Sequence, residues 1–467
     1  MSIRRRRLLE GSAALLAVGL LPGCGRERGE PQSPVRYEPG KPLPWINWAG
    51  NQHCLPAARG APAMESELAE LLRRTQGSVR AVGSGHSFSA LVPTDGLLVA
   101  TDLLAGLVSH DAATLQADIW AGTRLHDLGP LLDARGQALP NMPDIDYISL
   151  GGGIATSAHA SGTRWASLSA YVKGLTLATP TGELLECSAT QHADVFQAAR
   201  CSLGALGIVT RIRLQNIASY TLTERNGVER IEDVLDDIDS RFAAHRHFEL
   251  MPLPHSEFCL TVATDEAAEG DAPAGSDDLE AVYKIRSLWE SISGLPYADR
   301  VYDFLLERLM GGSGGMVRTG PWYTVLPHIR QVRFREMEYT VPAEVGPACL
   351  REILRTIRER RLPDCFPLEY RHVAADDVFL SMFEGGAGAS ISVHQFGDTD
   401  YRPYFAEIEP IFWKYGGRPH WGKLHTLDAA RLAALYPRHW QDFRDVRRAL
   451  DPAGRMLNPH LRHVLEV

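Results

Sequence analysis

Two residues of opposite charge, Glu369 and Arg371, stand two positions apart in the segment 368–373. The segment is typical of a β-strand, in which residues two apart point to the same face of a sheet. On one face, the carboxylate can accept hydrogen bonds and the guanidinium can stabilise developing negative charge. The same spacing also suits a surface ion pair, which is the default interpretation when nothing else is known of the strand.

A glycine-rich turn at Val82–Phe88 has the composition of an anion-binding site. Gly83 and Gly85 allow the backbone to approach a ligand closely and to adopt positive φ angles. Successive N–H groups in such a turn form a nest that suits a diphosphate. The spacing is not GxGxxG and no helix is expected to follow, so a Rossmann site is a poor match. An ordinary turn between two strands is the alternative.

Two further glycine-rich segments follow, Ser149–Gly162 and Ser202–Thr210. The first places three consecutive glycines before small hydroxyl residues, so that many backbone donors would lie along one ligand. The second is a tight turn that leads into a strand. Each segment taken alone is better explained as a turn that serves packing.

The elements that must position these residues alternate between short apolar runs and helical patterns, which predicts a mixed α+β fold. The strands 172–178 and 183–187 flank a Thr-Gly turn and are predicted to form a hairpin. The tail from Leu427 is predicted to be helical and then extended. Helices are expected at 65–76, 125–134, 194–199, 350–359 and 404–415, and other strands at 79–82, 97–100, 107–108, 115–120, 208–214, 333–341, 368–373 and 389–396.

Composition limits the class of protein. The chain has 467 residues, 45% hydrophobic and 22% charged, which indicates a globular protein with a real core and more than one folding unit. Its 48 Lys+Arg against 57 Asp+Glu give a net charge of −9, so we expect no nucleic-acid partner. No apolar run reaches the roughly 18 residues of a membrane-spanning helix.

The N-terminus predicts an export signal. Four arginines, Arg4–Arg7, precede a short, interrupted apolar stretch, Leu8–Leu21, and together they resemble a twin-arginine signal peptide. The end of the stretch, Leu21-Pro22-Gly23-Cys24, resembles a bacterial lipobox. We therefore expect an exported bacterial protein on the periplasmic or cell-surface side, anchored to the membrane through a lipidated Cys24. An ordinary signal peptide cleaved nearby and a leader without function are the alternatives.

Seven cysteines are present, and six remain if Cys24 is acylated. An oxidising compartment would permit pairing, but one sequence does not define which cysteines pair. No CxxC motif occurs, so a thioredoxin-like or zinc-ribbon site has no support, and we expect no metal site. Buried free thiols, with one bridge at most, are the favoured interpretation.

Taken together, the three glycine-rich segments, in this order and at these separations, resemble the FAD domain of the vanillyl-alcohol oxidase (PCMH) type. Within that superfamily the chain is similar to the FAD-linked sugar-1,4-lactone and alditol oxidases, which include gulonolactone, arabinonolactone and alditol oxidases. The likeness covers nearly the whole chain after residue 42. The other segments that carry it are Asn47–Asn51, Thr94–Gly96, Leu368–Asp377, His420–Lys423 and Asp451–Asn458.

The resemblance implies an α+β fold in which a two-part FAD-binding domain is joined to an α+β substrate (cap) domain. The C-terminal segment would return to the FAD domain. The expected boundaries are 1–24 for the signal peptide, 25–42 for a tether, 43–217 for the FAD-binding domain, 218–420 for the substrate domain and 421–467 for the C-terminal segment.

The resemblance also implies contacts with FAD. His86 would bond covalently to the 8α carbon of the isoalloxazine, and a non-covalent FAD packed against His86 is the alternative. Pro143 would lie beside the flavin C4a–N5 locus and favour an oxidase, unless it only shapes its turn. Asp144 stands where alditol oxidases have a small hydroxyl residue. The residues expected to line the FAD are Ala81, Val82, Gly83, Ser84, Gly85, His86, Ser87, Pro143, Ser149, Gly152, Thr156, Ser157, Ala158, His159 and Ile208.

Four residues of the C-terminal half are expected to act on the substrate. By the resemblance, Glu369 accepts hydrogen bonds from substrate hydroxyls, and Arg371 stabilises the charge that develops as hydride leaves carbon. Lys423 would lie near the flavin N1–C2 carbonyl or the substrate, with a solvated lysine as the alternative. His394 is a candidate base, or else a core histidine, and Glu336 is a further residue that could reach the pocket.

The implied activity is FAD-dependent oxidation of an aldono-1,4-lactone such as gulono- or arabinono-lactone, with hydride passing to flavin N5 and O₂ giving H₂O₂. An alditol oxidase is one alternative. A dehydrogenase of the same fold that passes electrons to a cytochrome or quinone is another. A sugar-binding lipoprotein in which flavin is structural or absent is the third.

Overall fold

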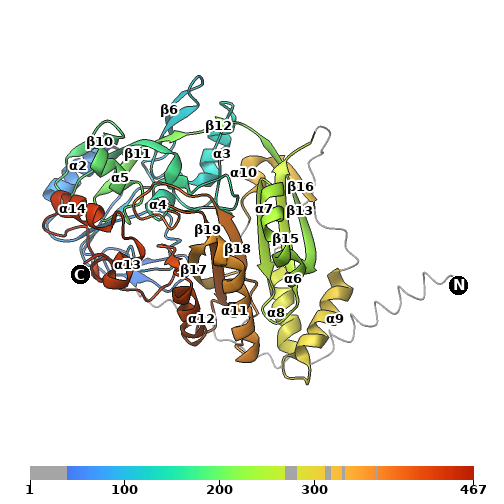
Figure 1. Ribbon diagram of the computed structural model, residues 1–467. Helices are drawn as coiled ribbons and strands as arrows, with labels where there is room; N and C mark the ends of the chain where they lie inside the picture. The colour runs from blue at the N-terminus through green and yellow to red at the C-terminus, as the bar shows by residue number, and fades with distance from the viewer. Residues whose placement is uncertain (1–38, 269–280, 311–316, 329–331, 364, 467) are drawn as a thin grey trace. The chain divides into compact units, whose positions relative to one another are not determined.

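The computed structural model describes residues 39–268, 281–310, 317–328, 332–363 and 365–466, which belong to one compact unit, Tyr37–Val467. The fold is α+β, with a parallel and an antiparallel sheet in the first half of the chain and a larger antiparallel sheet in the second (Figure 1). The expected export signal lies outside the described residues. Within the part described, no helix is long and apolar enough to cross a membrane.

The first half of the chain forms a three-stranded parallel sheet, β3-β5-β4, and a five-stranded antiparallel sheet, β10-β9-β11-β7-β6. The strands are β1 (Trp45–Ile46), β2 (His53–Cys54), β3 (Ala58–Gly60), β4 (Val79–Val82), β5 (Leu97–Ala100), β6 (Leu107–Asp111), β7 (Gln116–Trp120), β8 (Gln137–Ala138), β9 (Val172–Ala178), β10 (Leu184–Ser188), β11 (Ile208–Gln215) and β12 (Ile217–Ala218). The helices are α2 (Glu65–Arg74), α3 (Leu125–Asp133), α4 (Leu150–Ala155), the 3₁₀ turn η1 (Leu168–Tyr171) and α5 (Ala193–Ala199).

The predicted hairpin is confirmed, because β9 and β10 pair in antiparallel register with Leu184 opposite Ala178. The second glycine-rich segment differs from a plain turn, since part of it forms α4. Glycine disfavours helix, but Ser149 caps this one by accepting a hydrogen bond from Gly152 N at 3.3 Å.

The second half forms an eight-stranded antiparallel sheet with the order β16-β13-β15-β14-β18-β19-β17-β20. Its strands are β13 (Thr221–Arg230), β14 (His247–Pro252), β15 (Phe258–Glu266), β16 (Val317–Pro321), β17 (Phe334–Pro342), β18 (Glu369–Val373), β19 (Gly388–Phe396) and β20 (Arg418–Pro419). The helices are α6 (Ile231–Asp236), α7 (Ile238–Ala244), α8 (Ala281–Ile292), α9 (Ala298–Met310), α10 (Trp322–Val325), the 3₁₀ turn η2 (Ala343–Val345), α11 (Gly346–Glu359) and α12 (Arg402–Lys414).

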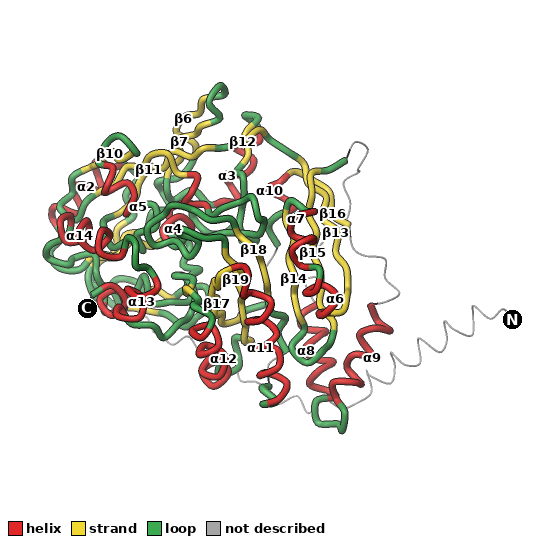
Figure 2. Tube along the Cα trace, viewed as in Figure 1, coloured by secondary structure: helices red, strands yellow, loops and turns green. Residues whose placement is uncertain are grey.

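The eight-stranded sheet has one apolar and one polar face. Helices α7, α11 and α12 lie along its apolar face (Figure 2). There Tyr339 stacks on Phe412 with ring centroids 4.8 Å apart, and Tyr370 packs against Phe242 at 6.1 Å. Because side chains alternate along a strand, the neighbours of Tyr339 and Tyr370 point the other way. The polar face therefore collects the charged residues of β17 and β18.

The C-terminal segment forms α13 (Ala429–Leu435), α14 (Trp440–Leu450) and α15 (Pro459–Leu465) and returns to the first half of the chain. Val79 N donates to Arg455 O at 2.8 Å. The prediction of an extended end is wrong. Asn458 Oδ1 caps α15 by accepting a hydrogen bond from Leu461 N at 2.9 Å, and a proline in the first turn favours the helix.

No disulfide joins the cysteines of the described residues, and all of these cysteines but Cys54 are buried, which agrees with the favoured interpretation. Burial raises the pKa of Cys187 to about 11 and that of Cys201 to about 12. Thiols with such pKa values hold little reactive thiolate at neutral pH, so these two cysteines serve packing.

Candidate active site

One cavity of about 230 Å³ lies between the glycine-rich turns and the polar face of the eight-stranded sheet. All but one of the expected FAD and substrate residues line it, together with Glu336 and Asp144. The exception is Ser157, which adopts a φ of 52° and turns its buried Oγ to Ser169 Oγ, 3.3 Å away. The prediction that Ser157 lines the FAD is therefore wrong for its side chain, which serves the core.

Backbone hydrogen bonds bring segments distant in the chain to this cavity. The first glycine-rich turn is joined to the segment His420–Lys423, since Phe88 N donates to Gly422 O at 2.7 Å. The second turn is joined to the third, since Leu203 N donates to Ala155 O at 3.1 Å. The three turns and the segment His420–Lys423 thus line the wall of the same cavity.

The wall fits a cofactor that carries a diphosphate. A methyl group on Gly83 would lie 2.0 Å from Ser149 Oγ, so a larger residue there would displace the hydroxyl that caps α4. Gly85 has a φ of +69°, a conformation that glycine adopts without strain. The buried Oγ of Ser84 has no hydrogen-bond partner, which leaves one polar atom for a ligand to satisfy.

His86 is held in a form suited to covalent bonding. Its ring stacks on Trp48, with centroids 5.3 Å apart and an interplanar angle of 27°. Burial lowers the pKa of His86 to about 4, with further lowering from the charges of Lys423 and Arg124. The imidazole is therefore neutral at neutral pH, and its lone pair is available as a nucleophile.

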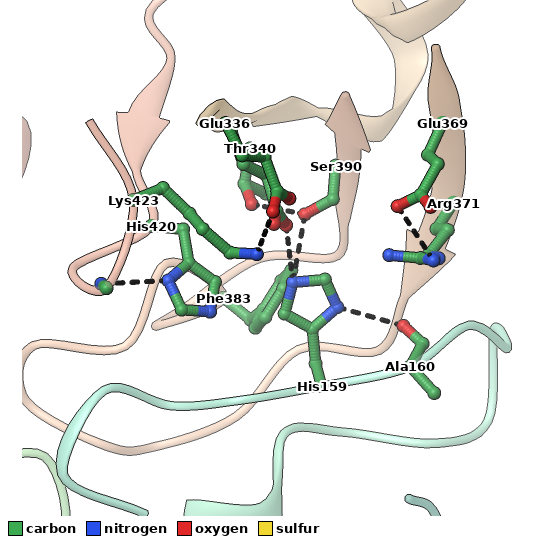
Figure 3. A network of polar contacts seen from close by, with 12 residues as sticks. His159, Ala160, Glu336, Thr340, Glu369, Arg371, Phe383, Ser390, His420 and Lys423 are labelled. Atoms are coloured by element: carbon green, nitrogen blue, oxygen red, sulfur yellow. Dashed lines mark hydrogen bonds and ion pairs between the residues drawn. The ribbon is translucent and has the colours of Figure 1, made fainter. Parts of the chain in front are cut away.

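Glu369 and Arg371 lie on one face of β18, as their spacing predicts, and form an ion pair of 2.8 Å (Figure 3). Their side chains are only 11% and 7% exposed, which excludes the surface ion pair. Arg371 also faces Glu249 at 3.1 Å and Asp144 at 3.5 Å. Burial alone would lower the pKa of Arg371, but these carboxylates, Glu249 foremost, raise it well above its usual value. The site thus keeps a buried positive charge.

Lys423 is tied to Glu336 rather than to solvent. Its Nζ lies 2.5 Å from Glu336 Oε2 (Figure 3). His394 Nε2 lies 3.7 Å from the same carboxylate, while its Nδ1 donates to Pro367 O at 3.0 Å. Burial opposes ionisation of Glu336, but Lys423 and then His394 outweigh it and bring the pKa of Glu336 to about 2. In return, Glu336 raises the pKa of His394 despite the opposing effect of burial.

A second buried cluster joins the turn to the sheet (Figure 3). Both nitrogens of His159 face oxygens, Glu338 Oε1 at 2.7 Å and Ala160 O at 2.9 Å. His420 Nδ1 accepts a hydrogen bond from Gly422 N at 3.0 Å, so its proton lies on Nε2. His159, Glu338 and His420 have the residue types of a metal site, but a protonated Nε2 is a poor ligand.

Glu338 and Glu249 are site residues that the sequence interpretation missed. Glu338 stands two positions after Glu336 on β17, the same spacing that drew attention to Glu369 and Arg371. The spacing of two residues could therefore have identified Glu338 from the sequence. Glu249 lies on β14, a strand that was not predicted, and it meets Arg371 only because the two residues pair across strands.

The chain matches the FAD binding domain family over residues 56–188. The cholesterol oxidase of Brevibacterium sterolicum has the same fold, with a TM-score of 0.74 at 14% identity over 93% of this chain and 100% of that chain. This fold, the FAD-binding domain and the charged cavity define an FAD-dependent oxidoreductase.

The D-arabinono-1,4-lactone oxidase family matches residues 212–464. L-gulono-1,4-lactone dehydrogenase of Mycobacterium tuberculosis is 35% identical, over 90% of this chain and 99% of its own length. L-gulonolactone oxidase of Mus musculus is 29% identical over 91% and 98%, and alditol oxidase of a Streptomyces species is 29% identical over 90% and 98%. The chain belongs to the D-arabinono-1,4-lactone oxidase family.

Proposed function

We propose that this protein oxidises a hydroxyl-bearing carbon of an aldono-1,4-lactone with FAD as its cofactor. One observation carries the proposal: Glu369–Arg371 and Lys423–Glu336–His394 lie in the same cavity as the glycine-rich wall that fits FAD. The relatives named for gulonolactone and arabinono-lactone support this substrate class, and the alditol oxidase relative makes alditols the second candidate.

The turns that line the cavity would hold the cofactor, with the backbone around Gly83 and Gly85 at its diphosphate and His86 bonded to its ring. Bound FAD supplies the acceptor for the electrons removed from the substrate carbon. Lys423 contributes a cation in the same cavity, which stabilises negative charge that develops there.

The substrate would be oriented by the charged groups of the sheet. Glu369 accepts hydrogen bonds from hydroxyl groups, and the Arg371 guanidinium is held in place by Glu249 and Glu369, which reduces the reorganisation needed to stabilise negative charge. His394 is the candidate to take the hydroxyl proton. Its Nδ1 is committed to Pro367 O, so Nε2 is the basic atom, and the Glu336 carboxylate stabilises the imidazolium that results.

A substrate panel tests this proposal. Under anaerobic conditions, gulono- or arabinono-1,4-lactone should bleach the flavin absorbance faster than xylitol or sorbitol does. Glu369→Gln should slow the bleaching, because the amide is neutral and its NH₂ end cannot accept a hydrogen bond from a substrate hydroxyl. Glu352→Gln, which alters an exposed Glu–Lys pair, is the matched control and should leave the rate unchanged. Bleaching by none of these compounds would refute the proposal.

We further propose O₂ as the electron acceptor. Pro143, which lines the cavity, favours a path for oxygen, although one relative is named a dehydrogenase and another an oxidase. Oxygen uptake during turnover supports the oxidase, and Pro143→Ala should slow uptake while dye reduction continues. Dye reduction without oxygen uptake in the unaltered protein would refute it.

The covalent link and the anchor are proposed on the resemblance of His86 and Cys24 to their motifs. After acid precipitation, flavin should stay in the pellet of the unaltered protein and move to the supernatant in His86→Ala. Cys24→Ser should move the protein from the membrane fraction to the soluble fraction. Flavin in the supernatant of the unaltered protein would refute the link, and an unchanged membrane fraction in Cys24→Ser would refute the anchor.

A further inference from the structure

Arg80 is a buried arginine of the cofactor cavity that the proposed mechanism does not use. It stands on β4, lines the cavity and is only 2% exposed. Its guanidinium donates to backbone carbonyls: Nε to Leu91 O at 2.8 Å, Nη1 to Gly204 O at 2.7 Å and Met456 O at 2.5 Å, and Nη2 to Leu203 O at 2.7 Å. These acceptors come from three distant segments of the chain.

Among the residues that the structure describes, no carboxylate lies at ion-pair distance from the Arg80 guanidinium. Burial lowers the pKa of Arg80 to about 9, and no acid opposes that effect. A buried cation held only by carbonyl dipoles is costly, and an anionic ligand in the same cavity would offset that cost.

Two of the carbonyls belong to a strained turn. Leu203 and Gly204 have φ angles of 55° and 66°, so two successive residues are left-handed, and leucine disfavours this conformation. Arg80 binds both carbonyls and so fixes the third glycine-rich segment in the shape that lines the cavity.

Another of the four acceptors, Met456 O, belongs to the C-terminal segment. Met456 N is itself held by Asp451 Oδ2 at 2.8 Å, so the loop from Asp451 to Met456 has a fixed shape where it meets Arg80. The guanidinium therefore joins β4, the third turn and the C-terminal loop at one point beside the cofactor.

We propose that Arg80 is a positioning residue that couples docking of the C-terminal loop, residues 451–458, to the binding of FAD. Because the guanidinium closes the cavity wall, docking of the loop favours FAD binding and FAD binding favours docking of the loop. This is reciprocal linkage between two sites. The inference rests on FAD as the cofactor named under the proposed function, and not on the identity of the sugar.

Arg455 offers a matched control. Its guanidinium also binds backbone carbonyls at the same seam, including Pro180 O at 2.5 Å and Thr75 O at 2.6 Å. Unlike Arg80, it does not line the cavity. Substituting Arg455 should weaken the docking of the C-terminal loop without acting directly on the cofactor wall.

The test uses the full chain in the His86→Ala background, where bound FAD can exchange. FAD affinity is measured by quenching of flavin fluorescence, and protection of residues 451–458 by hydrogen exchange with and without FAD. Arg80→Lys should raise the Kd about tenfold or more, because an ammonium cannot span carbonyls on three segments. It should also abolish the FAD-dependent protection. Arg455→Lys should raise the Kd less than Arg80→Lys does and should keep the FAD-dependent protection, because the Arg80 contacts that couple the two events remain.

A second variant reaches the same contact from the other side. A methyl group on Gly204 would lie 3.2 Å from Arg80 Nη2 and force an L-residue into a left-handed turn. Gly204→Ala should weaken FAD binding, and its effect should add less than fully to that of Arg80→Lys. Equal Kd values for Arg80→Lys and its parent would overturn the inference alone, whereas unaltered protein that binds no FAD would overturn the proposed function as well.

Discussion

Replacing Glu336 by glutamine should destabilise the protein in a pH-dependent way. The pKa of Glu336 is about 2, against an ordinary 4.5. That difference of about 2.5 pH units, at 1.36 kcal/mol each, corresponds to about 3 kcal/mol of folding free energy at neutral pH. Breaking a buried ion pair by removing one partner costs about 3–5 kcal/mol, which agrees. The charge of Lys423, whose Nζ lies 2.5 Å from the carboxylate, is the largest of the causes that lower this pKa.

The sign of the pH dependence follows from the lowered pKa. The stabilisation by Glu336 is present above pH 4.5 and is lost as the pH falls from there towards 2. Urea unfolding followed by tryptophan fluorescence should therefore show the largest gap between the unaltered protein and Glu336→Gln near neutral pH. The gap should narrow as the unaltered protein is acidified below pH 4.5.

Glu352→Gln is the control for this experiment. Glu352 lies 2.6 Å from Lys414, but that lysine side chain is 60% exposed, so solvent screens the pair. We expect a much smaller change in unfolding free energy. A gap for Glu336→Gln that stays constant from neutral to acidic pH, or one no larger than that of the control, would show that the ion pair does not stabilise the fold as reasoned.

Two other substitutions test the cavity. Gly83→Ala should severely lower the flavin content of the purified protein, measured as visible absorbance per chain, because the added methyl would lie 2.0 Å from Ser149 Oγ. Gly294→Ala is the control and should keep its flavin, because nothing lies within 4 Å of the added methyl. Equal flavin contents in the two variants would contradict the steric argument. Arg371→Met should raise the pKa of Glu249, already raised by burial, and cost about 3–5 kcal/mol of unfolding free energy at neutral pH. Protonation neutralises the carboxylates that Arg371→Met leaves unpaired, so the loss of unfolding free energy should be smaller when urea unfolding is measured at mildly acidic pH. A loss that is larger at acidic pH would contradict the ion-pair geometry.

The sequence predicts best those elements whose apolar pattern and flanking turn residues indicate the same bounds. The strand Val79–Val82 and the strand Leu97–Ala100 are found as expected, and the helix expected to begin at Leu125 does so. Helix α15 was missed because a short helix depends on its cap, here Asn458, more than on periodicity. Strands β13 and β14 were missed because each has a partner distant in the chain, β16 and β18, and pairing, not local preference, decides them. Strand β15, which follows β14 in a short hairpin, was missed with them.

The candidate site was predicted where spacing along one element carries the information. Glu369 and Arg371 share a face because they stand two apart on one strand. The position of Glu249 opposite Arg371 depends on the register of β14 against β18, which no local pattern contains. Ser157 was misplaced because a single left-handed residue turned its side chain into the core.

The return of the C-terminal segment has a consequence for biosynthesis. The carbonyl of Met456 and the side chain of Asn458, which donates to Ala90 O at 2.8 Å, belong to the final stretch of a chain of 467 residues. While Met456 and Asn458 are still inside the ribosome, they cannot contact Arg80 and Ala90, and the wall beside β4 is incomplete. Chains terminated before residue 451 would therefore emerge colourless, because they lack the loop that meets Arg80 beside the cofactor cavity.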